Sequence, residues 1–456
     1  MLVIISDLHL TDGTTCTNIS ADAFALLGER LRDLAHRASW RADGAYRPIE
    51  QIDLLLLGDI FDHLHSTRWD ETFPSQAGLV RPWDDFKNPA FVQKIATITE
   101  GILARNADAF SSLRALSAEG VVIPVKPSFR PLSKYTGKGW SVPVRIFYMS
   151  GNHDWYFHLP GAAYNDIRRN VVKTMGLLNP PSRFPHDISE WGELEKTCLA
   201  HSVLARHGDL HDSINFDKTK GRDASALGDA IATELIDRFP SAVEDELGKE
   251  LSPSFFADLR EIVNVRPALF AAAWIEGLTR RWCPDPQQAG RVKEIWNELV
   301  DAFLKNPFVR SYDKPFAFDH VNAFDLVLRL TKKASMEFIS NLLDIVTEKF
   351  LSGDVSLSYA KYAIEEKAFQ ERAARYIVFG HTHYHEIKPL DSYDAQGEHH
   401  HQICFNSGTW HSVHTPTKQG RRNFVGHHVL TYLVFFKDDE RRGRPYESWS
   451  GTLAWE

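Results

Sequence analysis

The sequence predicts an α/β fold in which two sheets pack together and a large all-α segment is inserted. Short runs of aliphatic and β-branched residues are typical of buried strands, and they occupy residues 2–5, 52–57, 144–149 and 376–379. Between the first two runs, residues 21–38 have the apolar period of a helix. This order indicates a β-α-β unit, so loops at the carboxyl ends of parallel strands are expected to carry the functional residues.

Two later runs extend this frame. Residues 402–405 read as a strand, and residues 429–436 read as a longer, aromatic strand that we expect to close a second sheet. The frame therefore comprises residues 1–212 and 373–456, apart from an insertion within the first of these ranges.

Two insertions interrupt the frame. The first, residues 63–143, is expected to be part helical, with Phe91, Ile95, Ile98 and Ile102 on one helix face. The second, residues 213–372, is expected to be an all-α insertion or cap. Helices that merely enlarge the core are the alternative. Its helical periods include Val321, Phe324 and Leu328, and then Phe338, Leu342, Ile345 and Val346.

Composition narrows the class of protein. The chain has 456 residues, 43% of them hydrophobic, which is enough for one large core or two smaller ones. A formal charge of -8 argues against nucleic acid as a partner, because wrapping a polyanion requires a basic face. The four cysteines lack paired spacing, and no apolar run reaches the length of about 20 residues that spans a membrane. We expect a cytoplasmic protein without a transmembrane segment.

Five short segments follow the predicted strands and carry Asp, Asn and His in an order that chance rarely produces. They are Asp-Leu-His at 7–9, Gly-Asp-Ile-Phe-Asp at 58–62, Gly-Asn-His-Asp at 151–154, His-Gly-Asp at 207–209 and Gly-His-Thr-His at 380–383.

The side chains of these segments suit two divalent cations. Two metals about 3.5–4 Å apart need a bridging carboxylate, with oxygen and imidazole ligands on each side. The glycines before Asp59, Asn152 and His381 suit tight turns that bring the backbone close to the metals. The expected ligands are Asp7, His9 and His383 for one ion, Asn152, His207 and His381 for the other, and Asp59 as the bridge.

Such a centre predicts hydrolysis of a phosphate ester, in which a hydroxide bridging the metals attacks phosphorus. His153 directly follows Asn152 and is not needed as a ligand, so it is expected to protonate the leaving oxygen. Asp154 is expected to orient the ring of His153. Asp62, Asp209 and Asp212 are expected to support the loops or the ligands.

Together the five segments resemble the calcineurin-like metallophosphoesterase family, whose pattern is D-x-H, G-D-x-x-D, G-N-H-D, a His-Gly pair and G-H-x-H. The resemblance covers about residues 1–62, 144–212 and 373–437. It implies a four-layer α/β/β/α sandwich, the ligand roles given above, and manganese, iron, zinc or similar ions as cofactors. It says little about the insertions, so it does not name the substrate.

The fourth segment, His-Gly-Asp-Leu-His-Asp at 207–212, resembles the branch that contains UDP-2,3-diacylglucosamine hydrolases. That branch typically has Arg where this chain has His153, and it lacks so large an α-helical insertion. We therefore assign no lipid substrate.

Several functions remain compatible with the sequence. A phosphodiester or pyrophosphate substrate is favoured, because a cap suits substrates with a sizeable group beyond the phosphorus. The alternatives are a phosphomonoesterase, a nuclease, and a non-enzymatic scaffold like the retromer subunit that resembles this fold. The oligomeric state stays open.

His399, His400 and His401 follow a turn and are expected in a solvated hairpin rather than a metal tract. His63 and His65 are within possible reach of the substrate, although exposed loop imidazoles are common. The stretch 406–410 is expected to pack beneath the metals or to line the pocket.

Overall fold

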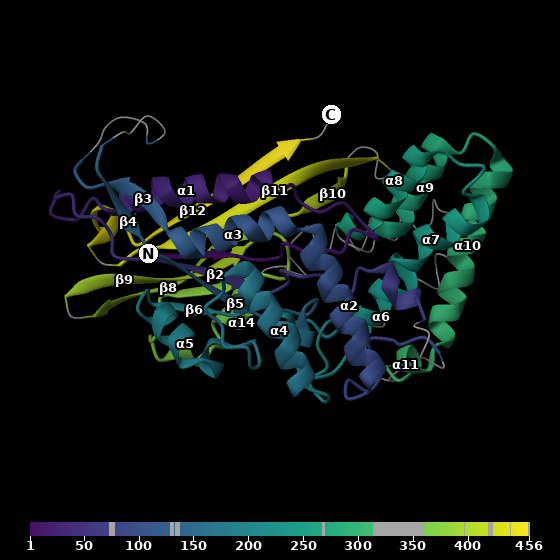
Figure 1. Cartoon of the computed structure of the whole chain (residues 1–456), viewed down its shortest axis with the longest axis horizontal. Coiled ribbons are helices and arrows are strands. Elements are labelled where there is room, and N and C mark those ends of the chain that lie inside the picture. The colour runs from purple at the N-terminus through teal and green to yellow at the C-terminus, as the bar shows by residue number, and fades with distance from the viewer. Residues whose placement is uncertain are drawn as a thin grey trace.

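A computed structural model describes residues 1–72, 78–127, 132, 137–266, 270–312, 359–395, 397–417, 423–437 and 439–454. The fold is mixed α/β. Strands gather toward one end of the molecule, and helices α7 (Arg238–Leu247) to α10 (Pro286–Lys305) form the other end (Figure 1). Within the described part of the chain, no helix combines the length and the apolar character needed to span a membrane.

The first sheet has the strand order β10-β11-β1-β2-β5, with β12 paired to β11. β1, β2 and β5 pair in parallel, and helix α1 (Asp22–Ala38) connects β1 to β2, which confirms the predicted β-α-β unit. The strands are β1 (Leu2–Ile5), β2 (Ile52–Leu57), β5 (Val144–Met149), β10 (Ser412–Pro416), β11 (Phe424–Phe435) and β12 (Tyr446–Ala454).

One strand expectation is wrong. Residues 429–436 were expected to close a second sheet, but residues 429–435 belong to β11, which pairs antiparallel with β1 in the first sheet. The register places Leu2 opposite Phe435 and Ile4 opposite Leu433. The apolar pattern shows that such a strand is buried, but it does not specify the strand beside it.

The second sheet has the order β6-β7-β9-β8, in which β6, β7 and β9 are parallel. β8 and β9 form an antiparallel hairpin, and His399, in the outer part of β9, is exposed. The hairpin expected around His399, His400 and His401 is therefore confirmed, although these histidines lie within β9 rather than before a strand. The strands are β6 (Val203–Ala205), β7 (Tyr376–Phe379), β8 (His385–Ala395) and β9 (Glu398–Ser407).

A hydrophobic core joins the two sheets. Phe435 of the first sheet lies 5.2 Å from Tyr376 and 5.4 Å from Phe405 of the second, measured between ring centroids. Another core covers the opposite face of the first sheet with α1, α2 (Pro89–Arg105), α3 (Ala107–Glu119) and α4 (Ala162–Met175). The loops at the strand ends are thus held between rigid, well-packed layers.

The first insertion is part helical, as expected. It contains α2, α3 and a two-stranded sheet of β3 (Val121–Pro124) and β4 (Gly139–Val142). The predicted face of α2 is fully buried at Phe91, Ile95, Ile98 and Ile102. Asn88 caps this helix by accepting a hydrogen bond from the Ala90 amide, and Pro89 occupies its first turn.

The described part of the second insertion is helical and has a hydrophobic core of its own. The expected helices around Val321–Leu328 and Phe338–Val346 lie outside the described residues. Two short helices on either side of the insertion's main body contribute to the core between the sheets. They are α5 (Gly192–Leu199), which precedes the insertion, and α14 (Ala360–Ala363), which lies near its end. The other α-helices among the described residues are α6 (Leu227–Ile231), α8 (Pro253–Arg260), α9 (Ala271–Trp282), α11 (Pro307–Arg310) and α15 (Lys367–Gln370).

Phe435→Ala is expected to lower the free energy of unfolding by about 3–5 kcal/mol, because it opens a cavity between the two sheets. Val425→Ala on the same strand is the matched control, since Val425 is 52% exposed. It should change stability by less than about 0.5 kcal/mol. Urea unfolding measures both, and equal effects would contradict the inter-sheet core.

Candidate metal centre

The predicted site residues lie on five loops that begin at the carboxyl ends of parallel strands. Three of the strands belong to the first sheet and two to the second, so both sheets contribute side chains to one place. The site residues are Asp7 and His9 after β1, Asp59 after β2, Asn152 and His153 after β5, His207 after β6, and His381 and His383 after β7.

Five of these residues have a left-handed backbone, with φ between +46° and +67°. Non-glycine residues rarely adopt this conformation, and Asp and His tolerate it better than most. Such strain persists where the surrounding structure demands it, typically at functional sites. The five residues are Asp7, His9, Asp59, His381 and His383.

The glycines before the site residues permit close approach of the loops, as predicted. A Cβ atom added at Gly58 would lie 2.4 Å from His207 Nδ1, and one added at Gly151 would lie 2.3 Å from Asp59 Oδ1. At Gly380 it would lie 2.7 Å from Asp7 Oδ2. Any side chain at these positions would displace a predicted ligand.

One group of candidate ligands consists of Asp7, His9 and His383, whose ligand atoms all lie within 4.8 Å of one another. The two Nε2 atoms of the histidines are 3.0 Å apart, and His383 Nε2 lies 3.5 Å from Asp7 Oδ1. Burial and the nearby Arg266 guanidinium hold the pKa of His383 well below its ordinary value. His383 is therefore the neutral imidazole that metals bind.

A second group consists of Asp59, His207 and His381. His207 Nε2 lies 3.1 Å from Asp59 Oδ2 and 3.2 Å from Asn152 Oδ1, which brings Asn152 into the same group. The other ring nitrogen of His207, Nδ1, is 2.9 Å from the carbonyl oxygen of Leu57. That contact suits an N–H at Nδ1 and turns Nε2 toward the group.

Asp59 lies between the two groups. Its Oδ2 atom, 3.1 Å from His207 Nε2, is also 3.8 Å from His9 Nε2 of the first group. Its Oδ1 atom accepts a hydrogen bond of 2.8 Å from the amide of His153. One carboxylate therefore faces both sets of imidazoles, as the predicted bridging role requires.

The chemistry of these side chains fits metal ions. Asp7 and Asp59 are at most 1% exposed, and their ion-pair partners in the described part of the chain are histidines. Burial raises the pKa of Asp7, while burial of Asp59 is outweighed by His207, which lowers its pKa. Buried charges of this kind are either paired or bound to metals. Carboxylate oxygens beside imidazole nitrogens suit several divalent ions.

Asp62, rather than Asp154, orients His153. The Oδ1 atom of Asp62 lies 2.9 Å from His153 Nδ1, and its Oδ2 atom lies 2.8 Å from His9 Nδ1. Burial lowers the pKa of His153, but the carboxylates of Asp62 and Asp59 outweigh it and raise the pKa to about 9. Asp62 therefore supports a candidate ligand and the candidate acid at once, consistent with the supporting role expected for it.

The orienting contact expected of Asp154 is absent because its carboxylate is used elsewhere. It accepts hydrogen bonds from the amides of Gly151 and Ile60, at 2.6 and 2.9 Å, and from the Tyr148 hydroxyl at 2.6 Å. Burial and the charge of Asp59 raise the pKa of Asp154 to about 7. Asp154 thus joins the second and third loops and does not contact the His153 ring.

The other supporting aspartates behave as expected. Asp212 Oδ2 lies 3.1 Å from His381 Nε2, so it orients a candidate ligand. Asp209 forms a buried ion pair with Arg222.

The stretch 406–410 packs against the backbone of Asp7, a candidate ligand. The Thr409 hydroxyl and the Trp410 amide both donate to the Asp7 carbonyl oxygen, at 2.6 and 3.1 Å. The next residue, His411, was missed by the sequence analysis: it is buried, and its ring lies 5.8 Å from that of His9 in a stacked arrangement. In the sequence, only the position of His411 directly after residues 406–410 could have indicated that it lies near the site.

Residues of the second insertion contact the motif loops. Asp237 Oδ1 lies 2.7 Å from His65 Nδ1, and the ring of His65 lies 5.5 Å from that of His153. Asp229 accepts a hydrogen bond of 3.2 Å from the indole of Trp155. By contrast, His63 is fully buried beside Thr99 of α2, so it is a core residue. A single turn of π-helix, η6 (Ala232–Ile236), directly precedes Asp237, and such turns are frequent at functional sites.

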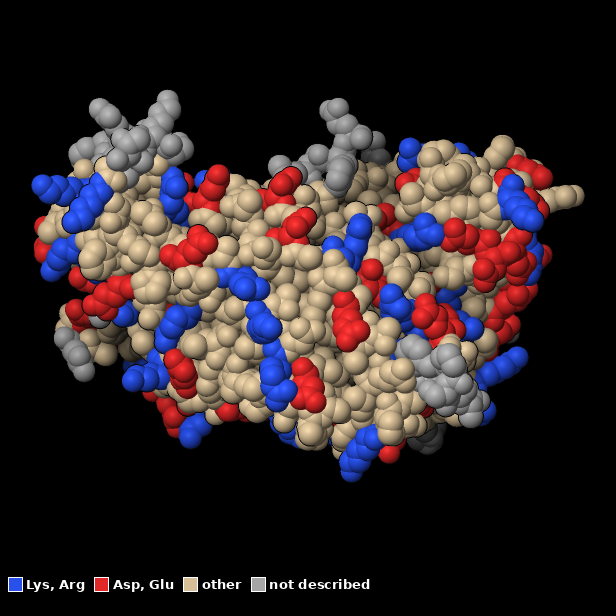
Figure 2. Space-filling view, viewed as in Figure 1, with Lys and Arg blue, Asp and Glu red and all other residues tan. Residues whose placement is uncertain are grey.

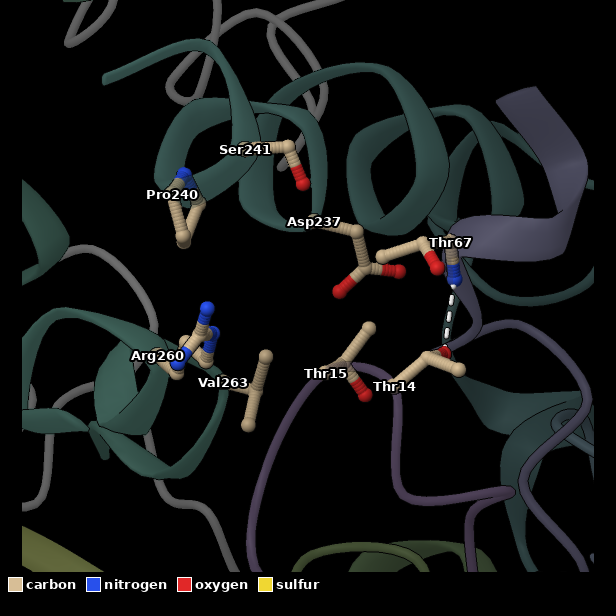
Figure 3. Close-up of a pocket in the computed structure, with 8 residues that line it drawn as sticks. All are labelled: Thr14, Thr15, Thr67, Asp237, Pro240, Ser241, Arg260 and Val263. Carbon is tan, nitrogen blue, oxygen red and sulfur yellow. Dashed lines mark hydrogen bonds between the residues drawn. The ribbon is translucent and has the colours of Figure 1, made fainter. Parts of the chain in front are cut away.

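A small cavity lined mostly by polar residues lies beside Asp237 (Figure 3). Thr14, Thr15 and Thr67 of the frame and first insertion face Ser241 and Arg260 of the second insertion across it. The Asp237 carboxylate points into this space, and its Oδ2 atom is buried without a hydrogen-bond partner among the described residues. The cavity therefore marks a polar junction between the helical insertion and the motif loops.

Comparison with known proteins gave no match to a family model and none to a curated protein. The function of the chain is therefore inferred from the site itself.

Gly58→Ala is expected to weaken Mn²⁺ binding and to destabilise the fold more than Gly44→Ala does. Both glycines have a similar φ, +83° and +81°, so both changes carry a backbone cost of about 1–2 kcal/mol. Only at Gly58 would the new methyl group meet a side chain, that of His207, because nothing lies within 4 Å at Gly44. The overlap should cost about 1–3 kcal/mol more. Urea unfolding and Mn²⁺ titration measure the two effects, and identical behaviour of the variants would contradict the close packing.

Proposed function

We propose that this protein is a calcineurin-like metallophosphoesterase that uses two divalent cations to hydrolyse a phosphodiester or pyrophosphate bond. The observation that carries the proposal is the position of Asp59, whose Oδ2 atom lies 3.1 Å from His207 and 3.8 Å from His9. A single carboxylate facing two sets of metal-type ligands is the arrangement that a dinuclear centre requires.

The proposed ligand sets follow the two groups of side chains. Manganese, iron, zinc or similar ions would fit these donors. When bound, two such cations supply an activated water and neutralise the charge on the phosphoryl oxygens. The ligands proposed are Asp7, His9 and His383 for one ion, Asn152, His207 and His381 for the other, and Asp59 for both.

The orientation of the imidazoles supports these assignments. His207 directs Nδ1 to the Leu57 carbonyl, and His9 directs Nδ1 to Asp62, so each presents Nε2 toward the proposed metals. Partners of this kind hold a ligating ring in one tautomer and raise its basicity.

His153 is proposed to protonate the leaving oxygen. Its Nδ1 atom is held by Asp62 at 2.9 Å, which leaves Nε2 as the atom that delivers the proton. The side chain is 16% exposed, so substrate can reach it, and its ring packs edge-on against His9 at 4.5 Å.

The helical insertion supports a substrate with a sizeable leaving group. Asp237 of the insertion contacts His65, which lies close to His153 in space. Asp229 of the insertion contacts Trp155, which lies close to His153 in the sequence. The proposed leaving group therefore departs toward the insertion, which would act as a cap. On the face shown in Figure 2, basic side chains are interspersed with acidic ones, which favours a small substrate over a nucleic acid.

The arrangement of layers is consistent with the four-layer α/β/β/α sandwich of this family, and we propose that fold for the frame. Two sheets that share a core, with helices α1 to α4 covering one outer side, support it. The described residues within 213–372 are proposed to form an all-α cap.

Chelator-treated protein is expected to hydrolyse bis-p-nitrophenyl phosphate only after Mn²⁺ is added back. Asp59→Asn and His207→Ala should each lower the rate at least about 10³-fold, because each removes a ligand that neutralises charge in the transition state. Release of p-nitrophenolate measures the rate.

His399→Ala is the matched control, since its exposed imidazole lies in the β8–β9 hairpin. It should retain full activity. Activity retained by Asp59→Asn would contradict the proposal, and turnover of p-nitrophenyl phosphate alone would indicate a phosphomonoesterase instead.

His153→Ala is expected to lower kcat by about 10²–10⁴-fold for a diester with an alkoxide leaving group, because such a group needs a proton to depart. The loss should be much smaller with p-nitrophenolate, which leaves as the anion. Comparing the two substrates in the variant and in the wild type measures this difference. The same loss with both would exclude His153 as the acid.

A further inference from the structure

A separate cluster of metal-ligating side chains shares no residue with the site described above. His158, His186 and Glu190 each offer one ligand atom, and these atoms all lie within 4.8 Å of one another. His158 ends the short turn η3 (Trp155–His158) that continues from the third motif, and Glu190 ends the turn η4 (Ile188–Glu190). Two segments about 30 residues apart in the chain thus meet at this point.

Two separations within the cluster are close to those around a tetrahedral ion. His158 Nε2 lies 3.6 Å from Glu190 Oε2, and His186 Nδ1 lies 3.0 Å from Glu190 Oε1. Metal–ligand bonds of about 2.0–2.2 Å place the ligand atoms of a tetrahedral site about 3.3–3.6 Å apart. The buried Nδ1 atom of His186 faces the Glu190 carboxylate, so this nitrogen is directed into the cluster.

A carboxylate orients the first histidine. Asp223 Oδ1 lies 2.6 Å from His158 Nδ1, which suits an N–H at Nδ1 and turns Nε2 toward Glu190. This is the carboxylate–histidine arrangement that accompanies zinc ligands in proteins. Asp223 comes from the second insertion, so the cluster joins the insertion to the loop that follows the third motif.

The charges around the cluster favour a cation. Although burial opposes its charge, hydrogen bonds from His158 and His186 hold the pKa of Glu190 well below its ordinary value. The two carboxylates, Glu190 and Asp223, face one guanidinium, that of Arg183, which lies 2.9 Å from Asp223. A protonated His158 shared by the two carboxylates is the competing explanation, because their hydrogen bonds outweigh burial and raise its pKa.

We propose that His158, His186 and Glu190 bind a divalent cation of the zinc class, at a site separate from the five motif loops. Two imidazoles and one carboxylate make a three-ligand zinc site with a fourth position open to water. The ion fastens the loop after the third motif to the loop that contains His186 and, through Asp223, to the helical insertion.

Zinc counting tests the proposal. Protein is stripped with chelator, loaded with Zn²⁺, freed of unbound metal and analysed for zinc per chain by elemental mass spectrometry. His186→Ala and Glu190→Gln should each bind about one zinc fewer than the wild type. Both side chains are partly exposed, at 18% and 35%, so the variants should stay folded. Circular dichroism confirms the fold.

Cobalt gives a second readout that separates this site from the motif site. The Asp59→Asn variant, in which the motif site is impaired, should still give the tetrahedral Co²⁺ absorption, and Asp59→Asn/His186→Ala should lose it. His399→Ala, which removes an exposed imidazole paired with Asp394 at 2.8 Å, should match the wild type. The same zinc content in the wild type and both cluster variants would overturn the proposal, as would an equal loss in His399→Ala. Neither result depends on phosphoesterase activity.

Discussion

The burial of Asp59 between two sets of imidazoles is the interaction on which the rest of the site depends. A carboxylate taken out of water is stable only when charges or hydrogen bonds compensate it. Here His207 lies 3.1 Å from one oxygen and the His153 amide donates to the other. Because these partners come from different loops, the loops must meet closely. Gly58 and Gly151 make that approach possible, since any Cβ there would collide with His207 or Asp59.

The same constraint explains the strained backbone and the supporting carboxylates. Asp7, Asp59 and His381 have a positive φ, which is tolerated because dense packing on both sides holds the loops in place. Asp62 then connects two loops by contacting His9 and His153 with its two oxygens. A single side chain thus couples the position of a candidate ligand to that of the candidate proton donor.

The helical insertion is joined to the site rather than attached at a distance. Asp237, Asp229 and Arg222 each contact a residue on or beside a motif loop, and the insertion also packs on the first sheet where Val265 pairs with His414. Most of its buried apolar side chains belong to a core distinct from the cores of the sheets. The residues that would select a substrate therefore stand on an element distinct from the one that holds the candidate metal ligands.

The sequence by itself determined the local features of this protein. Apolar runs gave the bounds of β1, β2, β5 and β7, and helical periodicity located α1 and the buried face of α2, because burial and helix formation depend on neighbouring residues. The Asp, Asn and His side chains of the five loops indicated metal chemistry, because these residue types are themselves the usual metal ligands.

Only the tertiary structure decided which partners these features meet. β11 lies beside β1 rather than in the second sheet, and His153 meets Asp62, 91 residues away, rather than the adjacent Asp154. His411 and Asp237 reach the site from segments with no motif. These contacts depend on how distant segments pack, and an apolar period or a short motif carries no information about which remote residue lies opposite.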